Sequence, residues 1–370
     1  MKSVGLYIHI PFCKNKCGYC SFYSNNKLQN IPCYIESLKE NIKRFSADFN
    51  AENFNVNSIF FGGGTPSVVG SENILNVLSS IRKHYNVAPD CEITVEVNPE
   101  SSSYSFFTDL KQGSINRISI GIQSFNDNEL RLLGRIHDSK TAIDAVNNAK
   151  KAGFDNINID LIAAIPGSDK NSLFFNLTML KELDIPHVCV YCLNIEEGTP
   201  FYTTRDTLQL LNDDEEFEMY ELVHNFLYNN GYNHYEISGF AKPGYKCRHN
   251  LKYWNFDDYL GFGPAAHSYF NSKRFYIEED TDKYLHDTIE IINEQQDNDG
   301  LFDYIMLSLR TDNGIDLNKC REMIPVDKYD AFLYKINRVI ALGYGKIQNN
   351  RFSLNYKGMF ISNSIILELV

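Results

Sequence analysis

Six short apolar runs alternate with amphipathic, helix-like stretches through residues 1–200. Between the runs, apolar residues return every three or four positions, for example at 71–85, 139–153 and 171–184, which predicts helices there. Apolar strands separated by helices are typical of a parallel sheet. Six such units in succession predict an α/β fold built on an incomplete (β/α)6 barrel, and a doubly wound sheet is the alternative that periodicity alone allows. The predicted strands are 4–10, 56–62, 91–99, 115–125, 155–167 and 186–195.

Small and polar residues stand at the ends of these predicted strands or just after them. All strands of a parallel barrel open their carboxyl ends onto one face, where enzymes of this architecture carry their chemistry. We therefore expect these residues to converge. They are Cys13, Cys17 and Cys20 after the first strand, the segment GGGTP (62–66) after the second, and Glu96, Asn98, Gln123, Asp160 and Cys192 on the later strands.

The regular alternation stops near residue 197. Residues 211–231 and 301–314 each predict a helix, whereas 232–269 is rich in aromatic residues, Gly and Pro and predicts strands and loops beside the barrel. The stretch 326–370 predicts a helix, a β-hairpin with an Asn-Asn turn and a final helix, a winged-helix-like pattern. Three parts are therefore expected. They are a barrel core at 1–200, an extension at 201–295, and a small α+β domain at 296–370.

Charge and composition exclude several classes of protein. The chain carries 35 Lys and Arg against 47 Asp and Glu, a net charge of −12, which disfavours nucleic acid and anionic lipid as partners. No run approaches the roughly 20 apolar residues of a membrane span, and the first residues lack the pattern of a secretion signal. We expect a cytoplasmic protein without a transmembrane segment, in which nine cysteines are not a disulfide set.

The first three cysteines form the pattern CxxxCxxC. Structural zinc and simple burial are the alternatives, but zinc sites usually close with four ligands, and no second cysteine pair with suitable spacing follows. Three closely spaced thiolates suit an iron–sulfur cluster better, and a 4Fe-4S cluster held by three thiolates leaves one iron open to another ligand. The pattern predicts that Cys13, Cys17 and Cys20 bind such a cluster.

This pattern resembles the signature of the radical S-adenosylmethionine (radical SAM) superfamily, in which an aromatic residue, here Tyr19, precedes the third cysteine. In that superfamily, a TIM-like partial barrel holds the cluster, and the open iron binds the methionine part of S-adenosylmethionine. One electron from the cluster then splits the sulfonium bond and yields a 5′-deoxyadenosyl radical. The segment GGGTP resembles the second motif, whose glycines let the backbone meet the methionine amino group. A plain turn after a strand is the alternative for GGGTP.

The closer resemblance is to the oxygen-independent coproporphyrinogen III oxidase branch of this superfamily. The segments YIHIPFC, FFGGGTP, EVNPE, IGIQSFND, LLGRIH and NIDLIAAIPG occur in the order of that branch. A single residue such as Gln123 or Asp160 could instead be a satisfied polar group of the barrel interior. The resemblance implies that S-adenosylmethionine is contacted by Tyr7, Tyr19, Gly63, Gly64, Thr65, Glu96, Gln123, Arg135, Asp160 and Cys192.

Two kinds of relative share this core. The oxidases have a fourth cysteine where this chain has Phe22, and a longer segment before the cluster than the twelve residues here. The stretch CRHNLKYW (247–254) instead resembles the HNxxYW motif of haem chaperones. That resemblance implies His249 as an axial ligand of haem iron, with Tyr253 and Trp254 providing aromatic surface. A packed strand end is the alternative for this motif.

The segment GFGPAAHSYF (261–270) also resembles the chaperones, although it departs from them at Pro264 and Ala265. A further departure is Ser21, which follows the third cysteine where the family has Asp. His267 within it either lines the S-adenosylmethionine pocket or is structural. His9 is expected to form hydrogen bonds in the barrel interior and Cys247 to be a bystander. Cys189 and Cys192 face opposite sides of a strand and are not a redox or zinc pair.

Taken together, the resemblance implies a haem chaperone that delivers haem to haem-requiring, respiratory enzymes, with peripheral membrane association and dimerisation left open. No residue is assigned a catalytic role. The enzyme alternative is oxidative decarboxylation of coproporphyrinogen III to protoporphyrinogen IX in porphyrin biosynthesis. A radical methyltransferase-like activity that uses haem is the third and least favoured.

Overall fold

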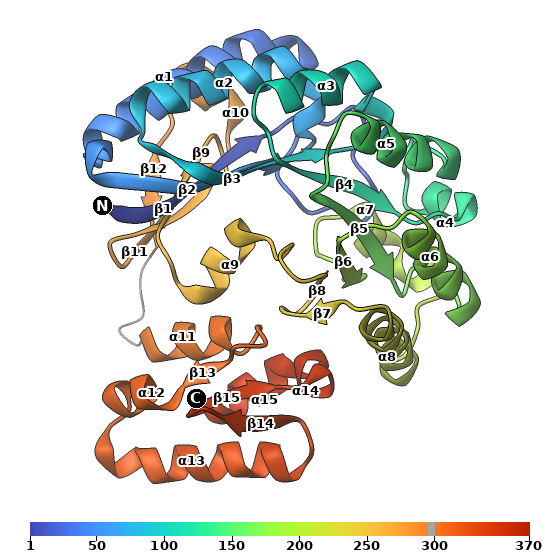
Figure 1. Cartoon of the computed structure of the whole chain (residues 1–370), viewed down its shortest axis with the longest axis vertical. Helices are drawn as coiled ribbons and strands as arrows, with labels where there is room; N and C mark the ends of the chain where they lie inside the picture. Colours follow the sequence, from blue (N-terminus) through green and yellow to red (C-terminus); the bar gives the residue numbers. More distant parts are fainter. Residues whose placement is uncertain (295–299) are drawn as a thin grey trace. The chain divides into compact units, whose positions relative to one another are not determined.

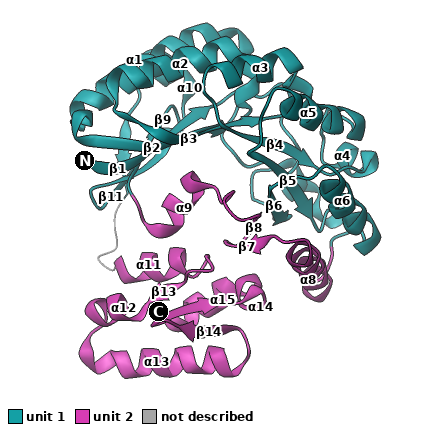
Figure 2. Ribbon diagram, in the orientation of Figure 1, with its two compact units in different colours: residues 1–210, 258–295 teal, residues 211–257, 296–370 magenta. Residues whose placement is uncertain are grey.

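The computed structural model describes residues 1–294 and 300–370, which form two compact units (Figures 1 and 2). Unit 1 comprises Met1–Leu210 and Asp258–Gln295, and unit 2 comprises Leu211–Asp257 and Gln296–Val370. Each unit joins two separate stretches of chain. The three consecutive parts expected from the sequence, 1–200, 201–295 and 296–370, stay a proposal about domain organisation.

Unit 1 is built on a mainly parallel sheet. Its first six strands lie side by side in chain order, each parallel to the next. The chain later adds β9, which is parallel to β1, and then three antiparallel strands. The expected incomplete (β/α)6 barrel is confirmed. The strands are β1 (Lys2–Ile10), β2 (Phe54–Gly63), β3 (Val87–Val97), β4 (Arg117–Gln123), β5 (Ile157–Ala163), β6 (His187–Cys192), β9 (Tyr259–Phe262), β10 (His267–Phe270), β11 (Lys273–Ile277) and β12 (Ile291–Asn293).

Helices lie along the outer side of this curved sheet (Figure 1). In α2 the buried residues Ile74, Val77, Leu78 and Ile81 are spaced as one helical face, the pattern of an amphipathic helix that packs on a sheet. The α-helices are α1 (Ile31–Asp48), α2 (Ser71–His84), α3 (Tyr104–Gln112), α4 (Asp127–Leu132), α5 (Ser139–Lys151), α6 (Lys170–Glu182), α7 (Pro200–Thr204) and α10 (Thr281–Leu285). Single 3₁₀ turns occur at Leu28–Asn30, Ala51–Asn53, Pro66–Val69, Pro99–Ser101 and Arg205–Thr207.

Side-chain caps fix where several of these helices begin, and so how the loops before them leave the strands. Asn126, Asp138 and Asp169 each accept a hydrogen bond from a backbone N–H in the first turn of α4, α5 and α6. Such caps satisfy donors that the helix itself leaves unpaired. The loops after β4 and β5 therefore have defined exits.

Unit 2 contains a three-stranded antiparallel sheet in the order β13-β15-β14. Asn349 and Asn350 connect β14 to β15 and both have positive φ, 51° and 57°, as a two-residue hairpin turn requires. The expected hairpin and winged-helix-like arrangement are confirmed. The elements are α8 (Asp213–Asn229), β7 (Asn233–His234), β8 (Gly239–Ala241), α9 (Arg248–Asn255), α11 (Gly300–Ser308), β13 (Ile315–Asp316), α12 (Leu317–Met323), α13 (Val326–Ala341), β14 (Gly345–Gln348), β15 (Arg351–Leu354), α14 (Tyr356–Phe360) and α15 (Ser362–Leu369).

The expectation of only strands and loops at 232–269 is wrong for residues 248–255, which form α9. His249 and Lys252, three positions apart, are its buried residues, so helical periodicity was present over barely two turns. The surrounding aromatic residues, Gly and Pro outweighed that short signal. The motif HNxxYW therefore lies on a helix.

A buried hydrogen bond ties α1 to the carboxyl end of β1. The Tyr34 hydroxyl donates to the carbonyl oxygen of His9 at 2.5 Å, and its ring packs edge-on against Phe12. Both side chains are fully buried. The first helix is thereby anchored just before the three-cysteine loop begins.

Tyr34→Phe should lower the free energy of unfolding by about 1–2 kcal/mol, because the buried His9 carbonyl loses its donor. Urea unfolding followed by circular dichroism measures the change. Tyr104→Phe, at an exposed position on α3, is the control and should change stability by less than about 0.5 kcal/mol. Equal effects of the two substitutions would contradict the anchoring role.

Candidate cofactor-binding site

A cavity of about 380 Å³ opens at the carboxyl ends of the parallel strands in unit 1. It is lined by residues from all six strands or from the loops that follow them, as the barrel geometry predicts. Twelve of the residues predicted to bind the cluster or S-adenosylmethionine line it. They are Cys13, Cys17, Tyr19, Cys20, Gly63, Gly64, Thr65, Glu96, Gln123, Arg135, Asp160 and Cys192.

The three cysteines lie on the loop that follows β1. Cys13 Sγ lies 3.4 Å from Thr65 Oγ1, and Arg135 Nη1 donates to Cys17 Sγ at 3.6 Å. Within residues 1–294 and 300–370, no three Cys, His, Asp or Glu side chains converge as a ready metal site. The fit to an iron–sulfur cluster therefore rests on three thiols that line one cavity, with the Arg135 guanidinium donating to one of them.

The glycines of GGGTP allow β2 to approach the start of the cysteine loop. Gly64 N–H donates to the Ile10 carbonyl at 2.9 Å, and a Cβ on Gly64 would lie 2.8 Å from the carbonyl oxygen of Phe12. Gly63 has φ 110°, a conformation that favours glycine. No larger residue fits at Gly64 without moving backbone, so a backbone surface is exposed to the cavity there.

Arg135 is held over the cavity by two neighbouring strands. Its Nη2 donates to Asn98 Oδ1 at 2.8 Å and to the Gly121 carbonyl at 2.7 Å, which fixes the guanidinium plane. Its Nη1 donates to Cys17 Sγ, and Arg135 lines the cavity. A fixed guanidinium of this kind can pair with a carboxylate ligand.

Two carboxyl groups share the other wall of the cavity. Burial and the neighbouring Asp160 raise the pKa of Glu96 to about 8, although its carboxyl accepts a hydrogen bond from the Gly63 N–H. Burial also raises the pKa of Asp160, against the opposing effects of Asn158 and Arg117. Paired acceptors in a buried site suit a ligand that brings hydroxyl or ammonium donors.

Gln123 closes β4 in an unusual conformation. Its φ is 70°, and the pairing of β4 with β5 shifts register between Gly121 and Gln123. Bulges and left-handed non-glycine residues are costly and concentrate at functional sites. The bulge places the Gln123 side chain among the cavity-lining residues.

The family model described as the Radical SAM superfamily matches residues 7–173. "Heme chaperone HemW" of Buchnera aphidicola (subsp. Acyrthosiphon pisum) is 35% identical over 98% of this chain and 97% of the relative. "Heme chaperone HemW" of Bacillus subtilis is 34% identical over 99% and 98%. The chain belongs to the HemW family of radical SAM proteins.

A solved structure supports the fold of this HemW family member. Coproporphyrinogen III oxidase (HemN) from Escherichia coli, a radical SAM enzyme, superposes with a TM-score of 0.84 at 22% sequence identity. The match covers 100% of this chain and 90% of that chain. At this identity the likeness shows the fold alone, and it agrees with the predicted partial barrel and added C-terminal domain.

Two predicted S-adenosylmethionine contacts lie outside the cavity lining. The Tyr7 hydroxyl lies 3.1 Å from His9 Nδ1. His9 in turn bonds to the Tyr23 carbonyl through Nε2, as expected of an interior histidine. His267 begins β10, is exposed, and lies 2.9 Å from Glu294 Oε1 through Nδ1. The roles of Tyr7 and His267 stay predictions.

His249 lies in unit 2, on α9, and is fully buried. Its Nε2 lies 2.8 Å from the Tyr253 hydroxyl, one helical turn along. An axial ligand must present a ring nitrogen to iron. Coordination through Nε2 would therefore require the Tyr253 hydroxyl to move away and the ring to become accessible.

Some cavity residues were missed by the sequence analysis, and Ser119 is the clearest case. It lines the cavity and stands two positions before Gly121 on β4. Residues two apart on a strand share a face, so the alternation around Gln123 held the signal. Lys16 and Asn194 also line the cavity, but they lie on loops that carry no periodic signal.

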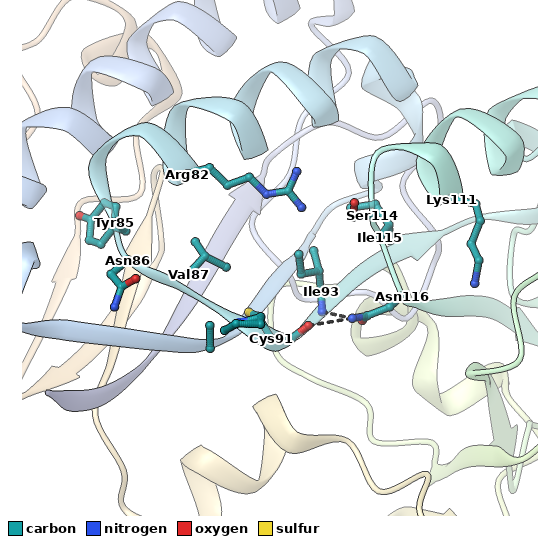
Figure 3. Close-up of a pocket in the computed structure, with 12 residues that line it drawn as sticks. Arg82, Tyr85, Asn86, Val87, Cys91, Ile93, Lys111, Ser114, Ile115 and Asn116 are labelled. Atoms are coloured by element: carbon teal, nitrogen blue, oxygen red, sulfur yellow. Dashed lines mark hydrogen bonds between the residues drawn. The ribbon is translucent and has the colours of Figure 1, made fainter.

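A second cavity, of about 640 Å³, lies at the amino ends of β3 and β4 (Figure 3). Arg82 of α2 and Lys111 of α3 border it. On its floor, Asn116 accepts from Ile93 N–H and donates to the Cys91 carbonyl, at 2.8 and 2.7 Å. It contains none of the described residues predicted for cofactor binding. We therefore place the candidate site in the smaller cavity, where the thiols and carboxyls meet.

No helix among the described residues is both long and apolar enough to cross a bilayer.

The buried Glu96 carboxyl should make the ligand-free protein less stable as pH rises. Its pKa of about 8 in the fold exceeds the ordinary 4.5, so the folded state holds a proton that the unfolded state releases between these values. The free energy of unfolding should fall across this window by about 1–3 kcal/mol, less than full linkage because the residue is partly exposed to the cavity. Urea unfolding at a series of pH values measures the slope.

Glu96→Gln should flatten this slope, and Glu72→Gln, at an exposed position on α2, is the control for loss of a surface carboxyl and should leave the slope in place. A slope that persists unchanged in Glu96→Gln would contradict the assignment.

Proposed function

We propose that the chain is a haem chaperone that binds a 4Fe-4S cluster, S-adenosylmethionine and haem, and that it delivers haem to haem-requiring respiratory enzymes in the cytoplasm. The observation that carries this proposal is the near full-length similarity to proteins named as haem chaperones. The cavity in unit 1 supports the cofactor part. The histidine motif on α9 supports the haem part.

The cluster would be held by the three cysteine thiolates of the loop after β1. Arg135 would stabilise the thiolate of Cys17, 3.6 Å away, and Thr65 would donate to Cys13. With three protein ligands, a 4Fe-4S cluster keeps one iron available. Phe22 occupies the position of the fourth cysteine of the oxidases. It lines the cavity, is 68% exposed and supplies no thiolate.

The same cavity would hold S-adenosylmethionine. The ligand carries an ammonium, a carboxylate, a sulfonium and two ribose hydroxyls, and the wall offers partners for each polar group. Backbone at Gly63 and Gly64 would meet the amino group, Arg135 the carboxylate, and Glu96 and Asp160 the hydroxyls. When bound to a reduced cluster, the cofactor supplies one-electron cleavage of a carbon–sulfur bond.

Haem would bind at the motif on α9. His249 would provide the imidazole, and Tyr253 and Trp254, which stand on the same helix, would provide aromatic surface for the macrocycle. The Tyr253 hydroxyl now engages Nε2, so haem binding would exchange a hydrogen bond for an iron–nitrogen bond. Because the Tyr253 hydroxyl can re-form its hydrogen bond with Nε2 when the iron–nitrogen bond breaks, haem binding at this site would be reversible, as release of a transported ligand requires.

Anaerobic reconstitution with iron and sulfide tests the cluster assignment. Cys17→Ser should lose the cluster, because two thiolates and a hydroxyl hold it poorly, whereas Cys33→Ser, at an exposed position on α1, should keep it. Electron paramagnetic resonance of the dithionite-reduced protein, with and without S-adenosylmethionine, measures both cluster content and cofactor contact. A cluster in Cys17→Ser equal to wild type, or a spectrum indifferent to the cofactor, would refute this part.

Haem titration tests the motif on α9. His249→Ala should abolish tight binding, and Tyr253→Phe should tighten it by about fivefold, because a hydrogen bond worth about 1 kcal/mol no longer competes for Nε2. His286→Ala, at an exposed histidine of unit 1, is the control. Retention of haem by His249→Ala would exclude this ligand.

The oxidase alternative is tested by anaerobic incubation of the reconstituted protein with coproporphyrinogen III. A chaperone should release no protoporphyrinogen IX. Its appearance would replace the proposed function by the enzyme alternative.

A further inference from the structure

Asp160 stands at the top of a column of buried polar side chains that the cofactor assignment does not use. The column crosses three neighbouring strands, β4, β5 and β6, in the barrel interior. Its members, which we call the Asp160 support, are Arg117, Ser119, Asn158 and His187. Their exposed fractions are 1%, 4%, 1% and 0%.

Strand register brings these residues together. Ser119 pairs with Asn158 across β4 and β5, and Asn158 pairs with His187 across β5 and β6. Arg117 lies two positions before Ser119, and Asn158 two positions before Asp160, so each pair faces the same side of the sheet. The parallel strands thus place the whole column on the interior face.

The hydrogen bonds within the column run from His187 through Asn158 and Ser119 to the Asp160 carboxylate. Asn158 Nδ2 donates to Ser119 Oγ at 2.6 Å and to Asp160 Oδ1 at 2.8 Å, which identifies it as the amide nitrogen. Its Oδ1 then faces His187 Nδ1 at 2.5 Å and accepts from it. Ser119 Oγ donates to the other carboxylate oxygen, Asp160 Oδ2, at 3.2 Å.

Arg117 supplies the charge at the base of the column. Its Nη2 lies 3.4 Å from His187 Nδ1. Burial and this cation hold the pKa of His187 well below its usual range, so His187 is neutral and Arg117 is the buried positive charge. A buried cation in a low-dielectric interior strongly favours a nearby anion over a neutral acid.

We propose that the Asp160 support keeps this carboxylate ionised and aimed into the cavity, ready to accept hydrogen bonds from the hydroxyl groups of a nucleoside. The choice of a nucleoside as the ligand rests on the proposed function. The ionisation of Asp160 in the ligand-free protein is independent of that function.

Other charged groups act on Asp160 and must be separated from the support. Burial raises the pKa of Asp160, while Asn158, Arg117, Ser119 and Arg135 each lower it. Glu96, on β3, interacts with Asp160 through the shared cavity. Glu96→Gln therefore provides the background in which Asp160 titrates without a neighbouring carboxyl.

The first test is a pH titration of the ligand-free protein by carboxyl carbon NMR, in the Glu96→Gln background, with Asp160→Asn to assign the signal. Asn158→Leu should raise the titration midpoint of Asp160 by about one pH unit, a tenfold change in its proton equilibrium, because an amide donor to the carboxylate is lost. Ser119→Ala removes the second donor at the cavity wall and should raise it by a smaller amount. This second variant serves if Asn158→Leu does not fold.

His187 separates positioning from simple packing. His187→Leu should raise the midpoint, whereas His187→Gln, which keeps an N–H donor, should restore it. The control is Thr94→Val on β3, whose buried hydroxyl has no hydrogen-bond partner among the described residues; it should leave the midpoint unchanged. Midpoints that stay at the parent value in Asn158→Leu and Ser119→Ala would overturn the proposal.

The second test is calorimetric binding of S-adenosylhomocysteine to the anaerobically reconstituted protein. Asn158→Leu should bind about tenfold more weakly than wild type, and Thr94→Val should bind as wild type does. Shifted midpoints without nucleoside binding by wild type would uphold the support and refute the cofactor proposal. Nucleoside binding with unshifted midpoints would do the reverse.

Discussion

Backbone pairing of β1 with β2 continues beyond the ends of both strands, and the whole candidate site depends on it. Ile10 pairs with Gly63, and Gly64 and Thr65 then donate to the carbonyls of Ile10 and Phe12 at 2.9 and 2.8 Å. This continuation is possible only because glycine leaves room for the opposing backbone. This pairing fixes where the cysteine loop leaves the end of β1, and it places Thr65 Oγ1 next to Cys13 Sγ.

Much of this arrangement could be predicted from the sequence, because a parallel barrel places the carboxyl ends of successive strands on the same face. Glu96, Gln123 and Asp160 are far apart in the chain. Gln123 ends β4, Glu96 lies one residue before the end of β3, and Asp160 lies midway along β5, and parallel strands bring such positions toward one face of the barrel. The prediction needed only the strand positions and the identity of the residue at each end. The hairpin of unit 2 was equally predictable, since Asn349 and Asn350 tolerate the positive φ that its turn demands.

The parts that could not be predicted depend on contacts between distant segments. No local sequence signal indicates that Tyr259–Phe262 returns to pair with β1. Because it does return, each compact unit is made of two separate stretches of the chain. The eight-residue helix α9 was too short for its periodicity to stand out. The hydrogen bond between Tyr253 and His249 follows directly from that helix, because side chains four positions apart meet on a helical face. A motif interpreted as extended could not reveal it.

The place of β9 beside β1 has a consequence for synthesis on the ribosome. The first strand emerges early, but its partner on one side does not exist until residues 259–262 have been made. One edge of β1 therefore stays open to foreign strands while most of the polypeptide is still being added. The interval also spans residues 211–257, which belong to the other unit, so the chain must begin a second compact unit before β1 gains this neighbour.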